Sequence, residues 1–155
     1  MKNIFLILLL TSVSFAFSQN ELKWKSNFDE AAKIAQETNK PILANFTGSD
    51  WCGWCKVLDR EVFSKPEFQK WAKENVVLLE VDFPRRKKLS KELQSQNNAL
   101  QKAFGVRGYP TVWLFNVGEG KNPKKNIVPH GKTGYVKGGP KEWIKTITKY
   151  MPKKS

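Results

Sequence analysis

The chain has 155 residues, a formal net charge of +13, and ten phenylalanines and six tryptophans within a hydrophobic fraction of 40%. This composition excludes a disordered chain, which would be poor in aromatic and apolar side chains. The length allows a single domain with one compact core, and the positive charge favours attraction to acidic proteins or anionic surfaces. The sequence contains no nucleic-acid-binding motif.

Residues 1–18 have the pattern of a secretory signal peptide. Lys2 gives a positive start, residues 4–10 are an unbroken apolar run, and Ala16-Phe17-Ser18 is a small-x-small cleavage site. The apolar run is short for a membrane span, although an uncleaved anchor remains the alternative. We therefore expect an exported protein, periplasmic in a Gram-negative bacterium and otherwise secreted, whose domain comprises residues 19–155. Export also argues against a nucleic-acid partner.

A first helix is predicted to follow Ser26, its N-cap, with Asp29 in the capping-box position, and to end at residues 39–41, Asn-Lys-Pro. The residues expected on its buried face are Phe28, Ala31, Ala32, Ile34 and Ala35. The short apolar run at residues 42–46, bounded by turn residues, predicts a central strand.

The stretch Trp51-Cys52-Gly53-Trp54-Cys55 comes directly after that strand and holds the only two cysteines of the chain. Residues i and i+3 share one face of a helix, so the two sulfurs can meet in a disulfide. Cys52 would lie at the N-terminus of a helix over residues 56–63, where free N–H groups and the helix dipole lower a thiol pKa from about 8.5 towards about 7. Cys52 is therefore the predicted nucleophile, and Cys55, shielded one turn further on, is the predicted resolving cysteine.

Two other interpretations of the cysteine pair are less favourable than redox chemistry. A purely stabilising disulfide is disfavoured, because closing a loop of about four residues contributes only about 2 kcal/mol, against nearly 5 kcal/mol for a loop of about a hundred. A zinc site needs four ligands, whereas the chain offers two cysteines and one histidine, His130. We therefore expect a redox-active dithiol without metal or cofactor, and we assign no role to His130.

The next segments predict a second strand beside the first. Ser64 is expected to cap a helix that has Pro66 in its first turn, and the apolar run at residues 76–81 predicts a buried strand. The inner face of that helix is expected to comprise Phe68, Trp71 and Ala72. Strand, helix and strand in this order predict a parallel pair. Residues 83–88 form a basic loop, for which a solvated surface is favoured over a docking patch for an acidic partner.

The remaining elements complete one domain. A helix is predicted over residues 90–104, and a third core strand over residues 111–115. The inward residues of that helix are expected to be Leu93, Leu100, Ala103 and Phe104. A turn cluster at residues 118–123 predicts a hairpin to a strand around Ile127 and Val128. Pro140 begins the last helix. Its buried stripe is expected to be Trp143, Ile144, Ile147 and Tyr150.

Three blocks of the chain resemble the thioredoxin superfamily. The blocks are residues 41–46, 51–56 and 104–111. Within the superfamily, residues 47–50 and 58–69 are most similar to the exported branch that includes the C-terminal domain of DsbD. The resemblance covers roughly residues 22–150. It implies an α/β thioredoxin fold, with a central mixed β-sheet flanked by helices.

The resemblance also assigns residues around the dithiol. It implies a cis Pro110 beside Cys52, which would leave the Tyr109 backbone free to pair with an extended substrate; a trans turn before the strand is the alternative. Trp51 is expected in the docking surface, and Trp54 fills the variable dipeptide, although both aromatic rings could equally be packing residues.

One position departs from the pattern of cytosolic thioredoxins. Their strand under the dithiol carries an acidic residue that accepts the proton of the resolving cysteine, whereas this chain has Asn45 there. An amide cannot act as that base. A bound water could substitute, as could Asp50, Glu61 or Lys56.

The sequence therefore predicts a monomeric thiol–disulfide oxidoreductase that reduces protein disulfides through Cys52 and Cys55, with a membrane protein supplying the electrons. A reductase is favoured because the chain lacks the helical insertion usual in DsbA-type oxidases. A dithiol oxidase or isomerase remains an alternative. Another is a non-catalytic binding module that uses the groove around Tyr109 and Pro110.

Overall fold

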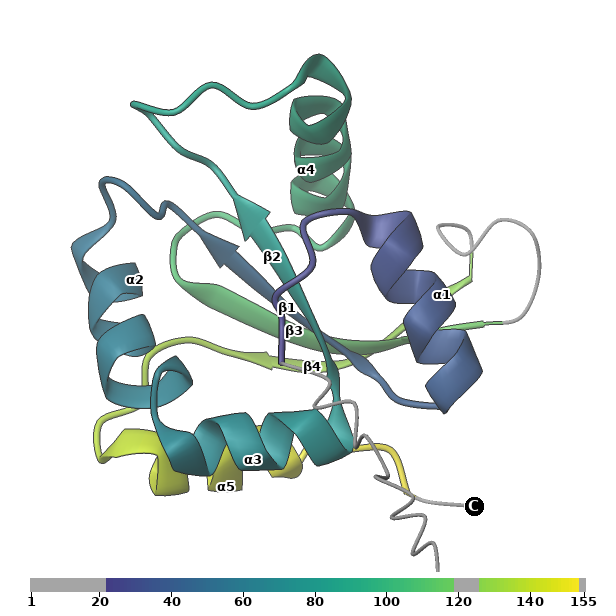
Figure 1. The fold of residues 1–155 in the computed structure, drawn as a ribbon, viewed down its shortest axis with the longest axis vertical. Helices are drawn as coiled ribbons and strands as arrows, with labels where there is room; N and C mark the ends of the chain where they lie inside the picture. The colour runs from purple at the N-terminus through teal and green to yellow at the C-terminus, as the bar shows by residue number, and fades with distance from the viewer. Residues whose placement is uncertain (1–21, 119–125, 154–155) are drawn as a thin grey trace, which may run out of the picture.

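The computed structural model describes residues 22–118 and 126–153. In chain order its elements are α1 (Phe28–Thr38), β1 (Ile42–Thr47), α2 (Gly53–Leu58), the π-helical turn η1 (Asp59–Phe63), α3 (Pro66–Asn75), β2 (Val77–Asp82), α4 (Lys91–Ala103), β3 (Thr111–Val117), β4 (Ile127–Thr133) and α5 (Gly139–Thr148) (Figure 1). The predicted order of helices and strands is confirmed. The expected helix over residues 56–63 is divided between α2 and η1.

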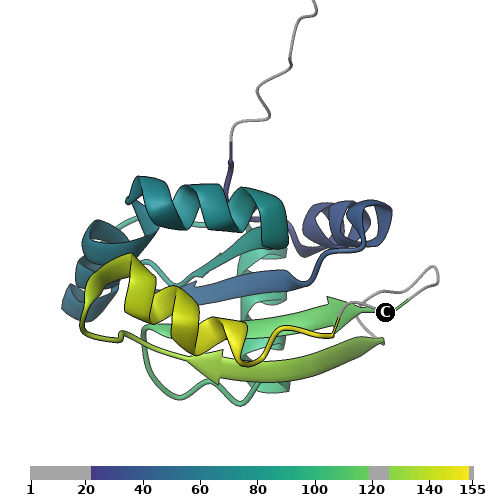
Figure 2. The same cartoon turned by 90° about the horizontal axis from the view of Figure 1, so that it is seen from below.

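The four strands form one mixed sheet in the order β2-β1-β3-β4. β1 pairs with β2 in parallel, as predicted, and β3 is antiparallel to both β1 and β4. Figure 2 shows α3 and α5 side by side in front of the strands and α4 behind them. The predicted mixed sheet flanked by helices is therefore confirmed.

Alternation along β1 and β2 divides the core into two layers. On one face, Ala44 and Leu79 pack with α1 and α4. On the other face, Leu43 and Leu78 pack against η1, α3 and α5. The fully buried side chains of this second layer include Leu58, Val62, Phe68, Trp143 and Ile147.

Because side chains alternate along a strand, the residues that follow Leu43 and Leu78 on this second face are Asn45 and Thr47 in β1 and Glu80 and Asp82 in β2. The second face therefore changes from apolar to polar towards the ends of both strands.

Two predicted helix caps are wrong by one residue. The N-cap of α1 is Asn27, whose side chain accepts a hydrogen bond from the Glu30 N–H at 2.9 Å. Lys65 precedes α3 without a side-chain cap, and the Ser64 hydroxyl bonds instead to Asp59. The helix predicted over residues 90–104 begins one residue later, at Lys91, because Ser90 is its N-cap and its hydroxyl accepts the Leu93 N–H.

Two residues expected to be buried are exposed. Ala103 lies on the solvent side of α4, where the buried polar residue is Asn97, whose amide donates to the Asp82 carbonyl at 2.8 Å. Tyr150 follows the end of α5 and is 39% exposed.

The predicted signal peptide and most of the predicted turn cluster, residues 119–123, lie outside the described residues. Within the described part of the chain, no helix has the length and apolarity needed to cross a membrane.

Candidate active site

Cys52 and Cys55 are joined by a disulfide at the start of α2. Cys52 is the N-cap residue, and its sulfur accepts a hydrogen bond from the Cys55 N–H at 3.2 Å. Both cysteines are 6% exposed. The same N–H would favour a Cys52 thiolate after reduction, because a donor aimed at sulfur stabilises its charged form. Cys52 thus occupies the helix N-terminus expected of the nucleophile, but the two cysteines are equally exposed, and the assignment of Cys55 as resolving cysteine stays a prediction.

The loop between β1 and α2 is held tightly from both sides. The Cys52 N–H donates to the Gly48 carbonyl at 2.8 Å. A side chain at position 48 would lie only 2.5 Å from the Trp51 ring, so glycine is required there. Ser49 donates its N–H and its hydroxyl to the Asp82 carboxylate, at 2.8 and 2.6 Å. These contacts fix the dithiol against the end of β2.

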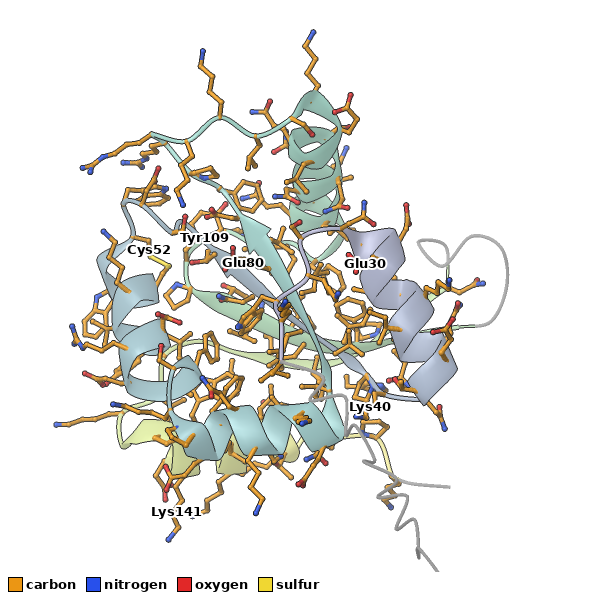
Figure 3. All side chains as sticks on the ribbon, viewed as in Figure 1. Glu30, Lys40, Cys52, Glu80, Tyr109 and Lys141 are labelled. Carbon is orange, nitrogen blue, oxygen red and sulfur yellow. A yellow bond between two sulfur atoms is a disulfide. The ribbon has the colours of Figure 1, made fainter. Side chains whose placement is uncertain are left out.

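On the outer side of the disulfide, aromatic residues connect the dithiol to the segment of Pro110. The Trp51 ring meets the Tyr109 ring edge-on at 5.9 Å between centroids, and its Nε1 donates to the Phe83 carbonyl at 2.8 Å. The Tyr109–Pro110 bond is cis, as predicted. Figure 3 shows Cys52 and Tyr109 at the same end of the sheet. Trp51 is thus both a packing residue and a neighbour of the reactive pair.

Trp54 is the most exposed aromatic side chain beside the dithiol, with 62% of its surface accessible. Its ring lies 5.3 Å from the ring of Tyr135, whose hydroxyl donates to Glu61. Tyr135 was not predictable from the sequence as a site residue, because its place beside Trp54 depends on the path of the chain after β4. Trp54 and Tyr135 form an apolar surface next to the disulfide, of the kind that contacts another protein.

On the inner side, Cys55 lines a cavity of about 250 Å³. The other lining residues are Trp24, Asn45, Thr47, Ser49, Lys56, Asp59, Phe63 and Glu80. Asn45 is buried, and its side-chain oxygen has no hydrogen-bond partner within the described chain. Its register partner on β2 is Glu80. The cavity therefore contains two carboxylates that sequence analysis did not consider, Glu80 and Asp59.

Both carboxylates suggested as substitutes for the missing acid, Asp50 and Glu61, have other partners. The Asp50 carboxylate accepts the backbone N–H groups of Arg85, Arg86 and Lys87. The bond from Arg85 is the main cause that lowers the Asp50 pKa below its ordinary value. The bond from Tyr135 likewise lowers the pKa of Glu61. Neither Asp50 nor Glu61 lines the cavity, whereas Lys56 does.

The basic loop at residues 83–88 lies beside the dithiol. Asp50 holds its backbone, and the Arg85 guanidinium lies 3.8 Å from the centre of the Trp51 ring. Residues 85–88 are exposed, in agreement with a solvated surface. Among the described residues, no three His, Cys, Asp or Glu side chains gather where a metal ion could bind.

The chain is similar to several characterised disulfide-exchange proteins. It is 34% identical to the disulfide bond reductase DsbH of Chlamydia pneumoniae over 74% of this chain and 69% of the relative. It is 31% identical to the thiol:disulfide interchange protein DsbD of Cronobacter sakazakii (strain ATCC BAA-894) over 66% of this chain, but it spans only 16% of that much longer protein. A solved structure of a DsbH oxidoreductase superimposes with a TM-score of 0.74 at 25% identity, over 84% of each chain.

These relatives and the Cys52–Cys55 pair identify a thiol–disulfide oxidoreductase. Residues 28–129 match the family described as the thioredoxin-like domain, and the chain belongs to that family.

Proposed function

We propose that this oxidoreductase is exported and reduces the disulfides of other proteins. The observation that carries the proposal is the position of Cys52, whose sulfur accepts the Cys55 N–H while the neighbouring Trp51 ring contacts Tyr109 of the cis-proline segment. A relative named as a disulfide bond reductase supports the same direction. The signal-peptide pattern of residues 1–18 supports export.

The reaction proceeds in two exchanges. The Cys52 thiolate attacks one sulfur of a substrate disulfide, and the other substrate sulfur leaves as a thiolate and takes up a proton. Deprotonated Cys55 then attacks the Cys52 sulfur, which releases the second substrate sulfur and leaves the Cys52–Cys55 disulfide. Two electrons pass to the substrate, and a membrane donor would return two electrons to the protein.

The surface around the disulfide suits a protein substrate. Neither the N–H nor the carbonyl of Tyr109 has a hydrogen-bond partner in the part of the chain that the structure describes. Both groups are therefore available to pair with an extended segment, as in β-strand addition. Trp54 and Tyr135 add apolar area beside the dithiol.

The reduction potential tests the direction of the reaction. A value near about −270 mV, that of thioredoxin, would support a reductase, whereas a value near about −120 mV would identify an oxidant. The measurement uses equilibration of the wild-type protein with glutathione buffers, followed by alkylation and mass spectrometry. A potential at the oxidising end would overturn the proposal.

Cysteine variants test whether catalysis occurs at all. The wild type should reduce insulin, and the Cys52→Ser, Cys55→Ser double variant should not. If the wild type were equally inactive while both proteins bound the same partner, the chain would be a non-catalytic binding module. Trapping with Cys55→Ser in the native host would identify the substrates as mixed disulfides.

A further inference from the structure

We infer that Glu80 is the proton acceptor for Cys55, in place of the acidic residue that thioredoxins carry at the position of Asn45. The inference rests on the proposed reductase function, because that reaction requires Cys55 to lose its proton. Glu80 is the register partner of Asn45 across the β1–β2 pair, and both residues line the same cavity as Cys55.

Strand geometry explains why Glu80 reaches this side of the sheet. Side chains alternate along β2, so Glu80 points to the same face as Leu78, which packs in the layer under α3, η1 and α5. Asn45 shares this face with Leu43 of the neighbouring strand. A carboxyl group at position 80 of β2, instead of position 45 of β1, therefore still lies beneath the dithiol. Figure 3 shows Glu80 on β2, at the same end of the sheet as Cys52 and Tyr109.

The Glu80 carboxylate is also the least committed carboxylate near Cys55. Within the described chain it makes no hydrogen bond or ion pair, whereas Asp82 is held by Ser49. Asp59, the other carboxylate of the cavity, is exposed and bonds to the Ser64 hydroxyl. A partly buried carboxylate without a partner in a polar cavity is costly to keep, which indicates a use beyond packing.

The surroundings of Glu80 adjust its affinity for a proton. The charged groups that face it are Asp82 on its own strand, Asp59 of η1, Lys56 of α2 and Lys87 of the basic loop. Burial is the main cause that raises the pKa of Glu80 above its ordinary value. The negative charges of Asp82 and Asp59 raise it further, and Lys87 opposes them. A carboxyl group whose pKa lies closer to neutral pH is a better proton acceptor for a thiol.

The second exchange starts from the mixed disulfide between Cys52 and the substrate. The S–H bond of Cys55 breaks, its proton passes to a Glu80 oxygen, and its electron pair remains on the sulfur. That sulfur forms the bond to Cys52, and the bond between Cys52 and the substrate sulfur breaks. The substrate leaves as a thiolate with the electron pair. When the protein is reduced again, Glu80 returns the proton to Cys55.

The test is single-turnover reduction of a peptide disulfide by the wild type and by Glu80→Gln. Near pH 7 the second exchange should slow by about 100-fold in Glu80→Gln, the usual scale for the loss of a general base. The deficit should shrink as pH rises, because hydroxide then removes the Cys55 proton. Alkylation of Cys52 by iodoacetamide should remain within about twofold of the wild-type rate, since the first exchange does not use Glu80.

Matched variants separate a proton acceptor from a residue that merely supports the fold. Glu74→Gln removes an exposed carboxylate of α3 and should leave both exchanges unchanged. Asn45→Asp added to Glu80→Gln returns a carboxylate to the cavity and should restore the rate to within about tenfold of the wild type. A structural defect would not be rescued by a carboxylate on the neighbouring strand.

The outcomes distinguish this inference from the proposed function. A wild type that reduces no disulfide would overturn the proposed function. An active wild type with an equally fast Glu80→Gln would overturn the role of Glu80 alone, as would a comparable loss found only in Asp59→Asn. If Glu80→Gln does not fold, carboxyl NMR of the wild type decides, because the Glu80 titration should shift between the disulfide and dithiol forms. An identical titration in both forms would overturn the inference.

Discussion

The two sides of the Cys52–Cys55 disulfide are built from different chemistry. The outer side consists of aromatic rings, with Trp51 packed on Tyr109 and Trp54 exposed beside Tyr135. The inner side is a cavity in which Cys55 shares space with Asn45 and Glu80. The outer side can bind a polypeptide, and the inner side can exchange a proton. If the proposed function is right, the disulfide lies between a surface for substrate recognition and a cavity for acid–base chemistry.

The polar character of the inner side arises from one change of residue type along the paired strands β1 and β2. Leu43 and Leu78 are fully or almost fully buried, and two positions further along β1 and β2 come Asn45 and Glu80 on the same face. The two strands therefore present apolar side chains to α3 and α5 and polar side chains to the dithiol. Mutations on each side of the disulfide should therefore affect different steps of the reaction.

The largest effect is expected from the cysteines themselves, which lie on the boundary between the two sides. Cys52→Ser should lower disulfide reduction by roughly a thousandfold or more, the scale on which loss of a nucleophile acts. Cys55→Ser should still attack the substrate but accumulate the mixed disulfide. Insulin reduction and mass spectrometry of the trapped adduct measure the two outcomes. Accumulation of the adduct in Cys52→Ser but not in Cys55→Ser would reverse the assignment of the two sulfurs.

On the outer side, Trp54→Ala should weaken binding of protein substrates without slowing the chemistry. KM for a protein disulfide should rise roughly five- to thirtyfold, the scale of an aromatic contact that contributes about 1–2 kcal/mol. Reduction of glutathione disulfide, which has no apolar side chain to bury against Trp54, should be unchanged. Val128→Ala, which removes an apolar side chain that is 52% exposed on β4, is the control. An equal loss with both substrates would place Trp54 in the chemistry rather than in binding.

The outer side was predictable from the sequence to a greater extent than the inner side. Trp51, Trp54 and Pro110 lie within short motifs, and the cis bond before Pro110 is confirmed. Glu80 has no such motif, because its relation to Cys55 depends on the register of β1 against β2. The alternation of side chains along a strand could have placed Glu80 on the same face as Leu78. The run at residues 76–81 is apolar at all of its other positions, however, and it therefore predicted only a buried strand.

The same limit explains the error in the predicted buried face of α4. The order of elements follows from local periodicity, which the sequence contains in full. The exposure of Ala103 and the burial of Asn97 depend instead on a carbonyl of another element, since Asn97 bonds to the Asp82 main chain. Polar residues that satisfy buried backbone groups cannot be recognised until the two elements are placed together.

A smaller effect is expected where the basic loop meets the outer side. Asp50→Asn should break some of the bonds from the N–H groups of Arg85, Arg86 and Lys87 and weaken the rest, because these bonds use both carboxylate oxygens and an amide has only one oxygen that accepts. Amide hydrogen exchange of these three residues should accelerate roughly tenfold. The Leu93 amide, which bonds to Ser90, should keep its exchange rate as an internal control. Unchanged protection in the loop would show that Arg85 stacking on Trp51 alone holds it.

The smallest effect is a pH dependence of stability that originates on the inner side. The Glu80 pKa is raised by burial in the folded protein, so between the ordinary pKa and the raised value the folded state binds more protons than the unfolded state. The contribution of Glu80 to stability is therefore fully present below its ordinary pKa and is lost as pH rises through the raised value. Glu80→Gln removes this loss, so its free energy of unfolding relative to the wild type should increase as pH rises through this window. Urea unfolding of the two oxidised proteins at pH values from 4 to 8 measures the difference, and Glu74→Gln should show no such trend. A difference in unfolding free energy that stays constant across that range would mean that Glu80 is as well solvated in the folded cavity as in the unfolded chain. The inner side of the disulfide would then lack a carboxyl group with raised proton affinity, which is the property that distinguishes the inner side from the outer side.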